Sequence, residues 1–169
     1  MTIKNILLLG NPILYNVSKP AEKQELSDVD SISRDLHDTM MEFRSKYGAG
    51  RAIAAPQIGV MKRIIYMHVD KPIVFINPVL EKLSKEMIEV WDDCMCFPDL
   101  LVRVRRHKSC TIRYWDLNWK MQTMNLEDSL SELMQHEYDH LDGILAVSRA
   151  IDSKSFAVRG QVKPGLVMD

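Results

Sequence analysis

Hydrophobic and polar positions recur with a helical period in the first third of the chain. From residue 28 to residue 47, apolar side chains return every three or four positions, at Ile32, Leu36, Met40, Phe43 and Tyr47. This spacing places them on one face of an α-helix. Acidic residues open the segment and Gly48 follows it, as is typical of helix boundaries. The pattern predicts an amphipathic helix over residues 28–47.

The middle of the chain has a different pattern. Short runs rich in β-branched and aromatic residues, separated by proline or charged residues, occupy positions 64–69, 73–76, 87–91, 102–104 and 111–115. Such runs predict strands, and residues 116–119 predict a hairpin turn before a further strand over 120–124. Residues 153–169 contain Gly160, Pro164 and Gly165, and we expect an irregular tail or a final edge strand there.

A second helical pattern follows the strands. Leu130, Leu133, Met134 and Leu141 form an apolar stripe. Ser129 with Glu132 fits a capping box at its start, and Gly143 fits a left-handed stop after its last turn. Many short strands before a late helix predict an α+β fold, with antiparallel strands packed around this helix in a single domain, residues 1–169.

The second helix carries the pattern His-Glu-x-x-His. His136 and His140 are four residues apart, so both imidazoles lie on one helix face and can bind the same metal ion. Glu137 lies about a hundred degrees round the helix from His136, where it suits proton exchange with water at the metal rather than ligation. The alternative is a helix with two ordinary surface histidines and a solvated glutamate.

Two other segments are candidates for the same site. A catalytic metal needs a third protein ligand, and Cys94, at the end of a predicted strand, is the best candidate. A small buried cysteine is the alternative for Cys94, and it is the expected state of Cys96 and Cys110. The loop over residues 48–59 is dense in glycine and alanine, which permits close approach of the backbone, and Gln57 stands in it as a polar residue between apolar neighbours.

Charge and cysteine content narrow the functional classes. The net charge is −1, so no field favours nucleic acid or an anionic membrane, and we expect neither partner. No apolar run approaches the length of a membrane span and no signal peptide is evident, so the default location is the cytoplasm. Three cysteines, two of them only two positions apart, do not form a disulfide scaffold.

Three separated segments together resemble one family. Ala54-Ala55-Pro56-Gln57, the strand-end Cys94, and Gln135-His136-Glu137-Tyr138-Asp139-His140 are similar, in order and spacing, to the three motifs of peptide deformylases. The resemblance is strongest over residues 5–150. It implies removal of the formyl group from the N-terminal formylmethionine of nascent peptides, possible contact with the ribosome, and release of formate.

The resemblance also implies roles for individual residues. Cys94, His136 and His140 would hold one divalent ion, usually Fe²⁺, with Zn²⁺ or Ni²⁺ able to substitute. Glu137 would act as the proton-carrying base and acid. The amide of Gln57 and the backbone N–H of Met95 would stabilise the oxyanion. These last two groups are donors that need no protonation, so they suit a developing negative charge.

The second motif departs from the family pattern Glu-Gly-Cys-Leu-Ser. Asp92, Asp93, Cys94, Met95 and Cys96 occupy its positions here. Asp92 keeps the acid and could pair with an arginine such as Arg106, whereas Asp93 replaces a glycine and restricts the backbone. In the first motif, Ala52 stands in place of a glycine, and Arg51 precedes it. We expect Arg51, Ala52, Ile53 and Cys96 to line the substrate entrance.

The departures leave three alternatives to deformylation of nascent peptides. A paralogue could act on another N-formyl amine, and a non-catalytic protein could keep the metal as a structural clip. Retention of Glu137 and Gln57 counts against the clip, because a structural site needs neither. A peptidase of the His-Glu-x-x-His type is disfavoured because its third ligand would be a downstream histidine or glutamate. The oligomeric state stays open.

Overall fold

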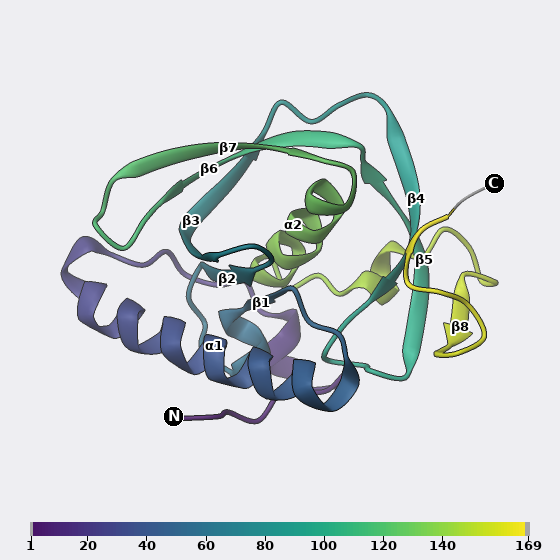
Figure 1. Ribbon diagram of the computed structural model, residues 1–169, viewed down its shortest axis with the longest axis horizontal. Coiled ribbons are helices and arrows are strands. Elements are labelled where there is room, and N and C mark those ends of the chain that lie inside the picture. Colours follow the sequence, from purple (N-terminus) through teal and green to yellow (C-terminus); the bar gives the residue numbers. More distant parts are fainter. Residues whose placement is uncertain (1, 168–169) are drawn as a thin grey trace.

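The computed structural model describes residues 2–167. Two α-helices and two antiparallel sheets make up its architecture (Figure 1). Four short 3-10 helices occur in the connections: η1 (Pro12–Tyr15), η2 (Lys23–Glu25), η3 (Ala55–Ile58) and η4 (Ala146–Arg149). The predicted α+β class and antiparallel strand arrangement are confirmed.

The first sheet contains five strands in the order β1-β2-β3-β6-β7. Its strands are β1 (Ala52–Ala54), β2 (Ile64–His68), β3 (Pro72–Glu81), β6 (Ser109–Trp115) and β7 (Met121–Glu127). The hairpin predicted at residues 116–119 joins β6 to β7, whose register runs from Ser109↔Glu127 to Trp115↔Met121. Strand β1 ends before Pro56, which cannot donate to a strand ladder.

The second sheet is smaller and has the order β8-β5-β4-β9. Its strands are β4 (Met87–Asp93), β5 (Leu100–His107), β8 (Phe156–Val158) and β9 (Gly165–Leu166). The last two come from the tail, and each pairs with one edge of the central β4–β5 hairpin. The tail over 153–167 therefore supplies two short edge strands, and residues 168–169 lie outside the described residues.

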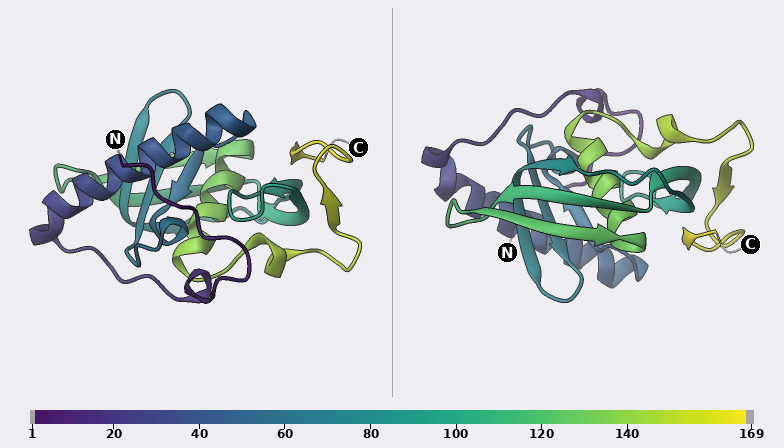
Figure 2. Two further views of the ribbon diagram at one scale, coloured as in Figure 1. Left: turned by 90° about the horizontal axis from the view of Figure 1, so that it is seen from below. Right: turned by 90° about the horizontal axis from the view of Figure 1, so that it is seen from above.

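Helix α2 (Asp128–Leu141) lies between the sheets, and helix α1 (Leu26–Tyr47) runs along the outside of the first sheet (Figures 1 and 2). The apolar faces of both helices are buried, including Leu36 and Met40 of α1 and Met134 of α2, each fully inaccessible to solvent. Helix α2 is buried on its polar side as well, because His136, Glu137 and His140 are at most 5% exposed. A helix buried all round places its polar side chains inside the protein, where each needs a partner.

The predicted capping box at the start of α2 is wrong. The helix begins at Asp128, with Glu127 at the N-cap position and no side-chain cap bond, so Ser129 already lies inside the first turn. The carboxylate of Glu132 forms an ion pair with Arg51 instead of reaching back to the backbone. The C-terminal end of α2 agrees with the predicted left-handed stop, since Gly143 follows the helix with φ +70°.

Candidate metal centre and active site

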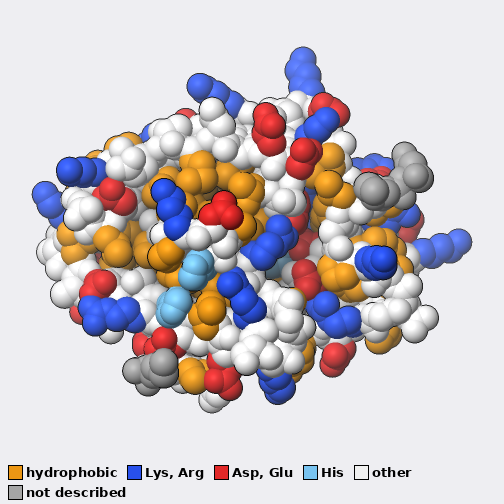
Figure 3. All heavy atoms as spheres, in the orientation of Figure 1, with side chains coloured by type: hydrophobic (Ala, Val, Ile, Leu, Met, Phe, Trp, Pro, Cys, Tyr) orange, Lys and Arg blue, Asp and Glu red, His pale blue; other side chains and the backbone are white. Residues whose placement is uncertain are grey.

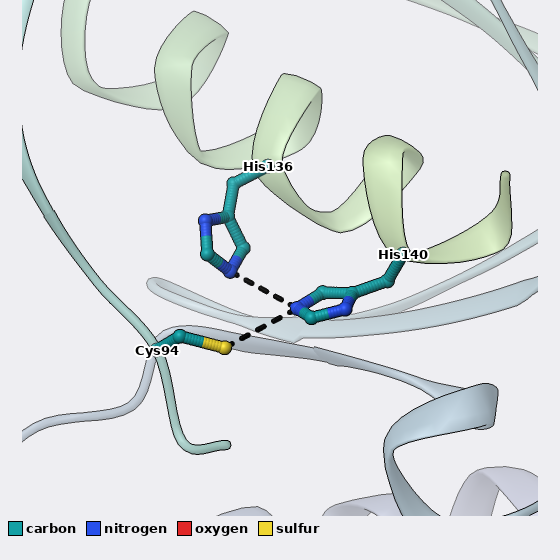
Figure 4. A group of neighbouring side chains, drawn as sticks. All are labelled: Cys94, His136 and His140. Atoms are coloured by element: carbon teal, nitrogen blue, oxygen red, sulfur yellow. Dashed lines mark hydrogen bonds between the residues drawn. The ribbon is translucent and has the colours of Figure 1, made fainter. Parts of the chain in front are cut away.

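Three side chains from two elements converge in the interior. His136 and His140 project from one face of α2, and Cys94 follows the last residue of β4, facing the helix (Figure 4). Their donor atoms lie within 4.8 Å of one another, and all three residues are buried. The structure thus brings the three predicted ligands together, although Cys94 and His136 are 42 positions apart in the sequence.

The spacing of these atoms fits a tetrahedral metal site. Nε2 of His140 lies 3.1 Å from Nε2 of His136 and 3.3 Å from Sγ of Cys94. With metal–nitrogen and metal–sulfur bonds of about 2.0 and 2.3 Å, the N–N and N–S edges of a tetrahedron are about 3.3 and 3.5 Å. Burial raises the pKa of the Cys94 thiol and lowers the pKa of His140. A thiolate at this depth needs a cation beside it, and a neutral imidazole is ready to bind one.

The orientation of His136 is fixed by a carboxylate. Oδ1 of Asp92 lies 2.8 Å from Nδ1 of His136, which keeps the proton on Nδ1 and directs Nε2 toward the other two donors. Burial disfavours the charged imidazole, but the charge of Asp92 outweighs it and raises the pKa of His136 to about 9. If His136 held a metal ion through Nε2, its Nδ1 would still lie in contact with Asp92.

Asp92 is itself held by an arginine. Arg106 donates from Nη2 to Oδ2 of Asp92 at 2.9 Å and from Nη1 to Asp139, and all three side chains are buried. Arg149 donates to the same carboxylate, from Nη2 to Oδ1 at 2.7 Å and from Nε to Oδ2 at 3.2 Å. The pairing of Asp92 with Arg106 expected from the sequence is present. The network runs from the surface at Arg149 to the predicted metal ligand His136.

Glu137 lies beside the three donors and is 3% exposed. Its Oε2 atom is buried and has no hydrogen-bond partner in the described part of the chain. Burial raises the pKa of Glu137 to about 7, although the neighbouring His136 opposes the shift. A carboxyl group with a pKa near neutrality can both accept and return a proton under working conditions.

Gln57 lies in η3, directly after β1 of the first sheet, and its side chain faces the donor atoms of this cluster. Its Oε1 accepts from the backbone N–H of Ala54 at 2.7 Å, which fixes the amide so that Nε2 points toward the sulfur atoms. Nε2 lies 3.7 Å from Sγ of Cys94 and 3.6 Å from Sγ of Cys96. Met95 follows Cys94, and its backbone N–H donates to no acceptor among residues 2–167. Both groups are donors available beside the three ligands.

A cavity of about 480 Å³ opens onto this cluster. It lies between the end of α1, the loop before β1, the end of β4, helix α2 and the tail. Arg51 and Ala52 line it, as predicted for the entrance. Ile53 and Cys96 do not: the side chain of Ile53 is fully buried in the core beside α1, and that of Cys96 packs in the core of the second sheet. For these two side chains the structure does not support the predicted contact with substrate.

One wall of the cavity was not expected from the sequence. Arg159 of the tail donates to Oδ2 of Asp93 at 2.8 Å, and together with Pro164 and Gly165 it lines the cavity. In Figure 3, charged side chains of both signs gather over this part of the surface. Opposite charges 66 positions apart carry no local signal, so the pair could not be found from the pattern of the chain.

The fold and the site are those of a metal-dependent hydrolase: a Cys–His–His set that could hold a metal ion lies beside a buried glutamate on the His-Glu-x-x-His helix. The family model described as polypeptide deformylase matches residues 3–156. The chain belongs to the polypeptide deformylase family.

Individual relatives agree over nearly the whole length. The peptide deformylase of Pseudothermotoga lettingae is 36% identical over 157 residues, covering 93% of this chain and 88% of that protein. The peptide deformylase of Rhizobium meliloti is 38% identical over 154 residues, covering 87% and 84%. Among solved structures, the peptide deformylase from Thermotoga maritima superposes with a TM-score of 0.83 at 26% identity, covering 90% of this chain and all of that one.

A second solved structure was determined with a peptide. The class I type b peptide deformylase from Acinetobacter baumannii with bound Met-Ala-Ser has a TM-score of 0.81 and 27% identity, and the match covers 88% of this chain and 98% of that one. Within residues 2–167 of the present chain, no helix combines the length and apolar character needed to cross a bilayer.

Proposed function

We propose that this cavity hydrolyses the N-formyl group of formylmethionyl peptides, with Cys94, His136 and His140 holding one divalent ion. Peptide deformylation is the activity of the family, and it releases formate and a free N-terminal amine. The observation that carries the proposal is the convergence of the three donor atoms within 4.8 Å, beside a buried Glu137 carboxylate oxygen that has no hydrogen-bond partner among residues 2–167. A bound ion would act as a Lewis acid on the formyl carbonyl and lower the pKa of the attacking water.

Glu137 is the proton carrier in this proposal. Its carboxylate accepts a proton from the attacking water, and the carboxylic acid then gives that proton to the amine nitrogen as the C–N bond breaks. The raised pKa of Glu137, about 7, makes both directions of transfer accessible near neutral pH. Without the second transfer the amine would have to leave as an anion, which is a poor leaving group.

The negative charge that develops on the formyl oxygen requires donors. Nε2 of Gln57 and the backbone N–H of Met95 fill this role, and the bond from Ala54 to Oε1 of Gln57 holds the amide in place before substrate arrives. Donors fixed in advance cost no reorganisation at the moment of reaction. Removing one such donor lowers kcat by about 10²–10³-fold in comparable hydrolases.

The walls of the cavity suit a methionine side chain and a peptide backbone. Phe43, Met95 and Leu133 give it apolar surface, and Arg51 and Ala52 lie at its entrance. A cavity of about 480 Å³ is within the range of small-ligand sites, about 300–1,000 Å³. These features favour a formylmethionyl peptide over a small polar formyl amine.

Fe²⁺ is the native ion in this proposal, and Zn²⁺ or Ni²⁺ can replace it. One thiolate and two imidazoles are compatible with all three ions. Because the substrates are nascent chains, we place the enzyme in the cytoplasm, where it can meet them at the ribosome.

The test is a comparison of substrates and ions. Protein loaded anaerobically with Fe²⁺, Zn²⁺ or Ni²⁺ is assayed for formate release from formyl-Met-Ala-Ser and from a formylated amine that lacks the methionine side chain. We expect preference for the peptide with every active ion, and the highest kcat/KM with Fe²⁺. Preference for the simple formyl amine would assign the site to another formylated substrate, and absence of formate with every ion bound would support a non-catalytic role.

A further inference from the structure

The cavity ends at a sheet edge that is only partly covered. Strand β4 pairs with β5 along its whole length, from Met87↔His107 to Asp93↔Leu101. On its other edge, the strand pairing recorded within residues 2–167 is with β9, at Val90↔Leu166 and Trp91↔Gly165. The end of β4 at Asp92 and Asp93 lines the cavity, and no strand of the described residues pairs with it on that side. An open edge next to a catalytic centre is a place where an extended peptide can add as a strand.

The backbone direction of β4 shows which groups such a peptide would meet. The N–H of Val167 donates to the carbonyl oxygen of Glu89 at 2.9 Å, so Glu89 presents its backbone to the β9 side. Backbone groups alternate along a strand, and Trp91 and Asp93 therefore present theirs to the same side. The backbone of Asp93 is next to the ligand Cys94, where the peptide would begin.

A peptide with its formyl group at the metal centre would run back along β4, away from Cys94. That direction is antiparallel to β4, and β9 is antiparallel to β4 as well. If the formylated residue lies opposite Asp93, the second residue lies opposite Asp92 and the third opposite Trp91, at about 3.3 Å per residue. Gly165 already pairs with Trp91, and Leu166 with Val90. Strand β9 lies where the third and later residues of the peptide would continue.

Hydrogen bonds hold the segment from Arg159 to Val167 against the second sheet at both of its ends. Strand β8 pairs with β5 at Leu100↔Val158, and the next residue, Arg159, donates from Nε to the carbonyl oxygen of Pro98 at 2.6 Å and from Nη2 to Asp93 at 2.8 Å. After the loop, Val167 is bonded to Glu89. The match to the family model ends at residue 156, so this segment lies beyond it.

We propose that residues 159–167 are a specificity element that replaces the downstream part of the substrate on the edge of β4. Only the first two residues of a formyl peptide pair with β4, and the rest of the chain leaves the sheet. Arg159 is a positioning residue that holds the segment through Asp93. This inference rests on the proposed function, because it places the formyl group at the metal centre.

The test compares two substrates of different length, formyl-Met-Ala-Ser and formyl-Met-Ala-Ser-Ala-Ala-Ser. The variants are a chain that stops after Lys163, which lacks β9, and Arg159→Ala, which keeps β9 but loses its anchor. Arg34→Ala is the control, because Arg34 is an exposed arginine paired with Asp30 on α1 and does not line the cavity. For each protein the quantity is the kcat/KM of the longer peptide divided by that of the shorter.

We expect a ratio within about twofold of one for the wild type and for Arg34→Ala. Without β9, the third residue of either peptide can pair with Trp91, but only the longer peptide reaches the backbone of Glu89, so the ratio should rise about tenfold. Arg159→Ala should lie between these values. A wild-type ratio already near ten, or a ratio that stays near one in both tail variants, would overturn the proposal.

A second measurement keeps this test separate from that of the proposed function. The products Met-Ala-Ser and Met-Ala-Ser-Ala-Ala-Ser are titrated calorimetrically into each protein, which requires no turnover. A longer product that binds about tenfold tighter only in the tail variants supports the specificity element even if formate release fails. Equal binding of both products in all proteins overturns it even if deformylation is fast.

Discussion

Replacing the buried Arg106 by methionine is the sharpest test of how the metal ligands are held. Arg106 and Asp92 are each 4% exposed and Asp139 is 9% exposed at the side chain, so Arg106→Met leaves carboxylates in the interior without their shared partner. Loss of one partner from a buried ion pair costs about 3–5 kcal/mol. Asp139 retains Arg149, so the main loss falls on Asp92 and the total should stay within that range.

The adjacent residue provides a matched control. Arg105 points away from the interior, is 60% exposed and pairs with Glu89, so Arg105→Met should cost at most about 1 kcal/mol. Urea unfolding of the metal-free proteins, followed by circular dichroism at pH 7, measures both free energies. Equal m-values for wild type and variants would show that the substitutions change stability and leave the surface exposed on unfolding unchanged.

The pH dependence of the Arg106→Met effect has a definite sign. In the wild type, burial opposes ionisation, but the charges of His136 and Arg106 lower the pKa of Asp92 from 3.8 to about 2. The stability that comes from ionised Asp92 is thus present above pH 3.8 and lost as the pH falls through about 2. The difference between wild type and Arg106→Met should therefore shrink as the pH falls from neutral toward about 2.

Metal binding gives a second readout for the same variant. Because Asp92 orients His136, Arg106→Met should lower the metal affinity about 10–100-fold, whereas Arg105→Met should leave it unchanged. Competition with a chromogenic chelator measures both affinities. If both variants lose similar stability, or if Arg106→Met keeps full stability and metal affinity, the reasoning about the network is refuted.

Three further predictions concern single side chains. Glu137→Gln should bind metal stoichiometrically yet lose about 10²–10⁴-fold in kcat, and substantial remaining turnover would exclude Glu137 as proton carrier. Cys94→Ala should lose metal, measured by plasma emission, together with metal-dependent thermal stability; unchanged metal content would exclude the thiolate ligand. Gly143→Ala should cost more than 1 kcal/mol in urea unfolding, because a Cβ there would lie 2.5 Å from the carbonyl oxygen of Tyr15 at φ +70°. Gly10→Ala, also at positive φ but with open space around it, should cost less, and equal costs would contradict the steric argument.

The helices were predictable because their signals are local. The three-to-four-residue period of apolar positions lies within each helix and shows which face will be buried. Helix α1 begins two residues before the predicted start and ends at the predicted residue. The strands were located by composition, but their division into two sheets was not. Strand β3 pairs with β6, and β4 and β5 form the centre of the other sheet. These pairings depend on contacts between distant segments, which no local pattern records.

The same distinction applies to the site. His136 and His140 share a helix face by spacing alone. Cys94 and Gln57 were candidates from their local sequence, but their roles were implied by the family resemblance, and both meet the helix only in the folded chain. The position of the Ile53 side chain follows from strand alternation: its neighbour Ala52 faces the cavity, so Ile53 faces the opposite side, into the core. The links from Arg106 to Asp139 and from Arg159 to Asp93 are also products of folding.

The central claim is that buried Glu137 carries the proton at a centre formed by Cys94, His136 and His140. Its most direct test is anaerobic formate release from formyl-Met-Ala-Ser by iron-loaded wild type and by iron-loaded Glu137→Gln, with the metal content of both proteins measured in the same samples. We predict rapid release by the wild type and at least a hundredfold slower release by the variant at equal iron content. Equal rates at equal iron content would contradict the role of Glu137, and no release by the iron-loaded wild type would contradict deformylation at this site.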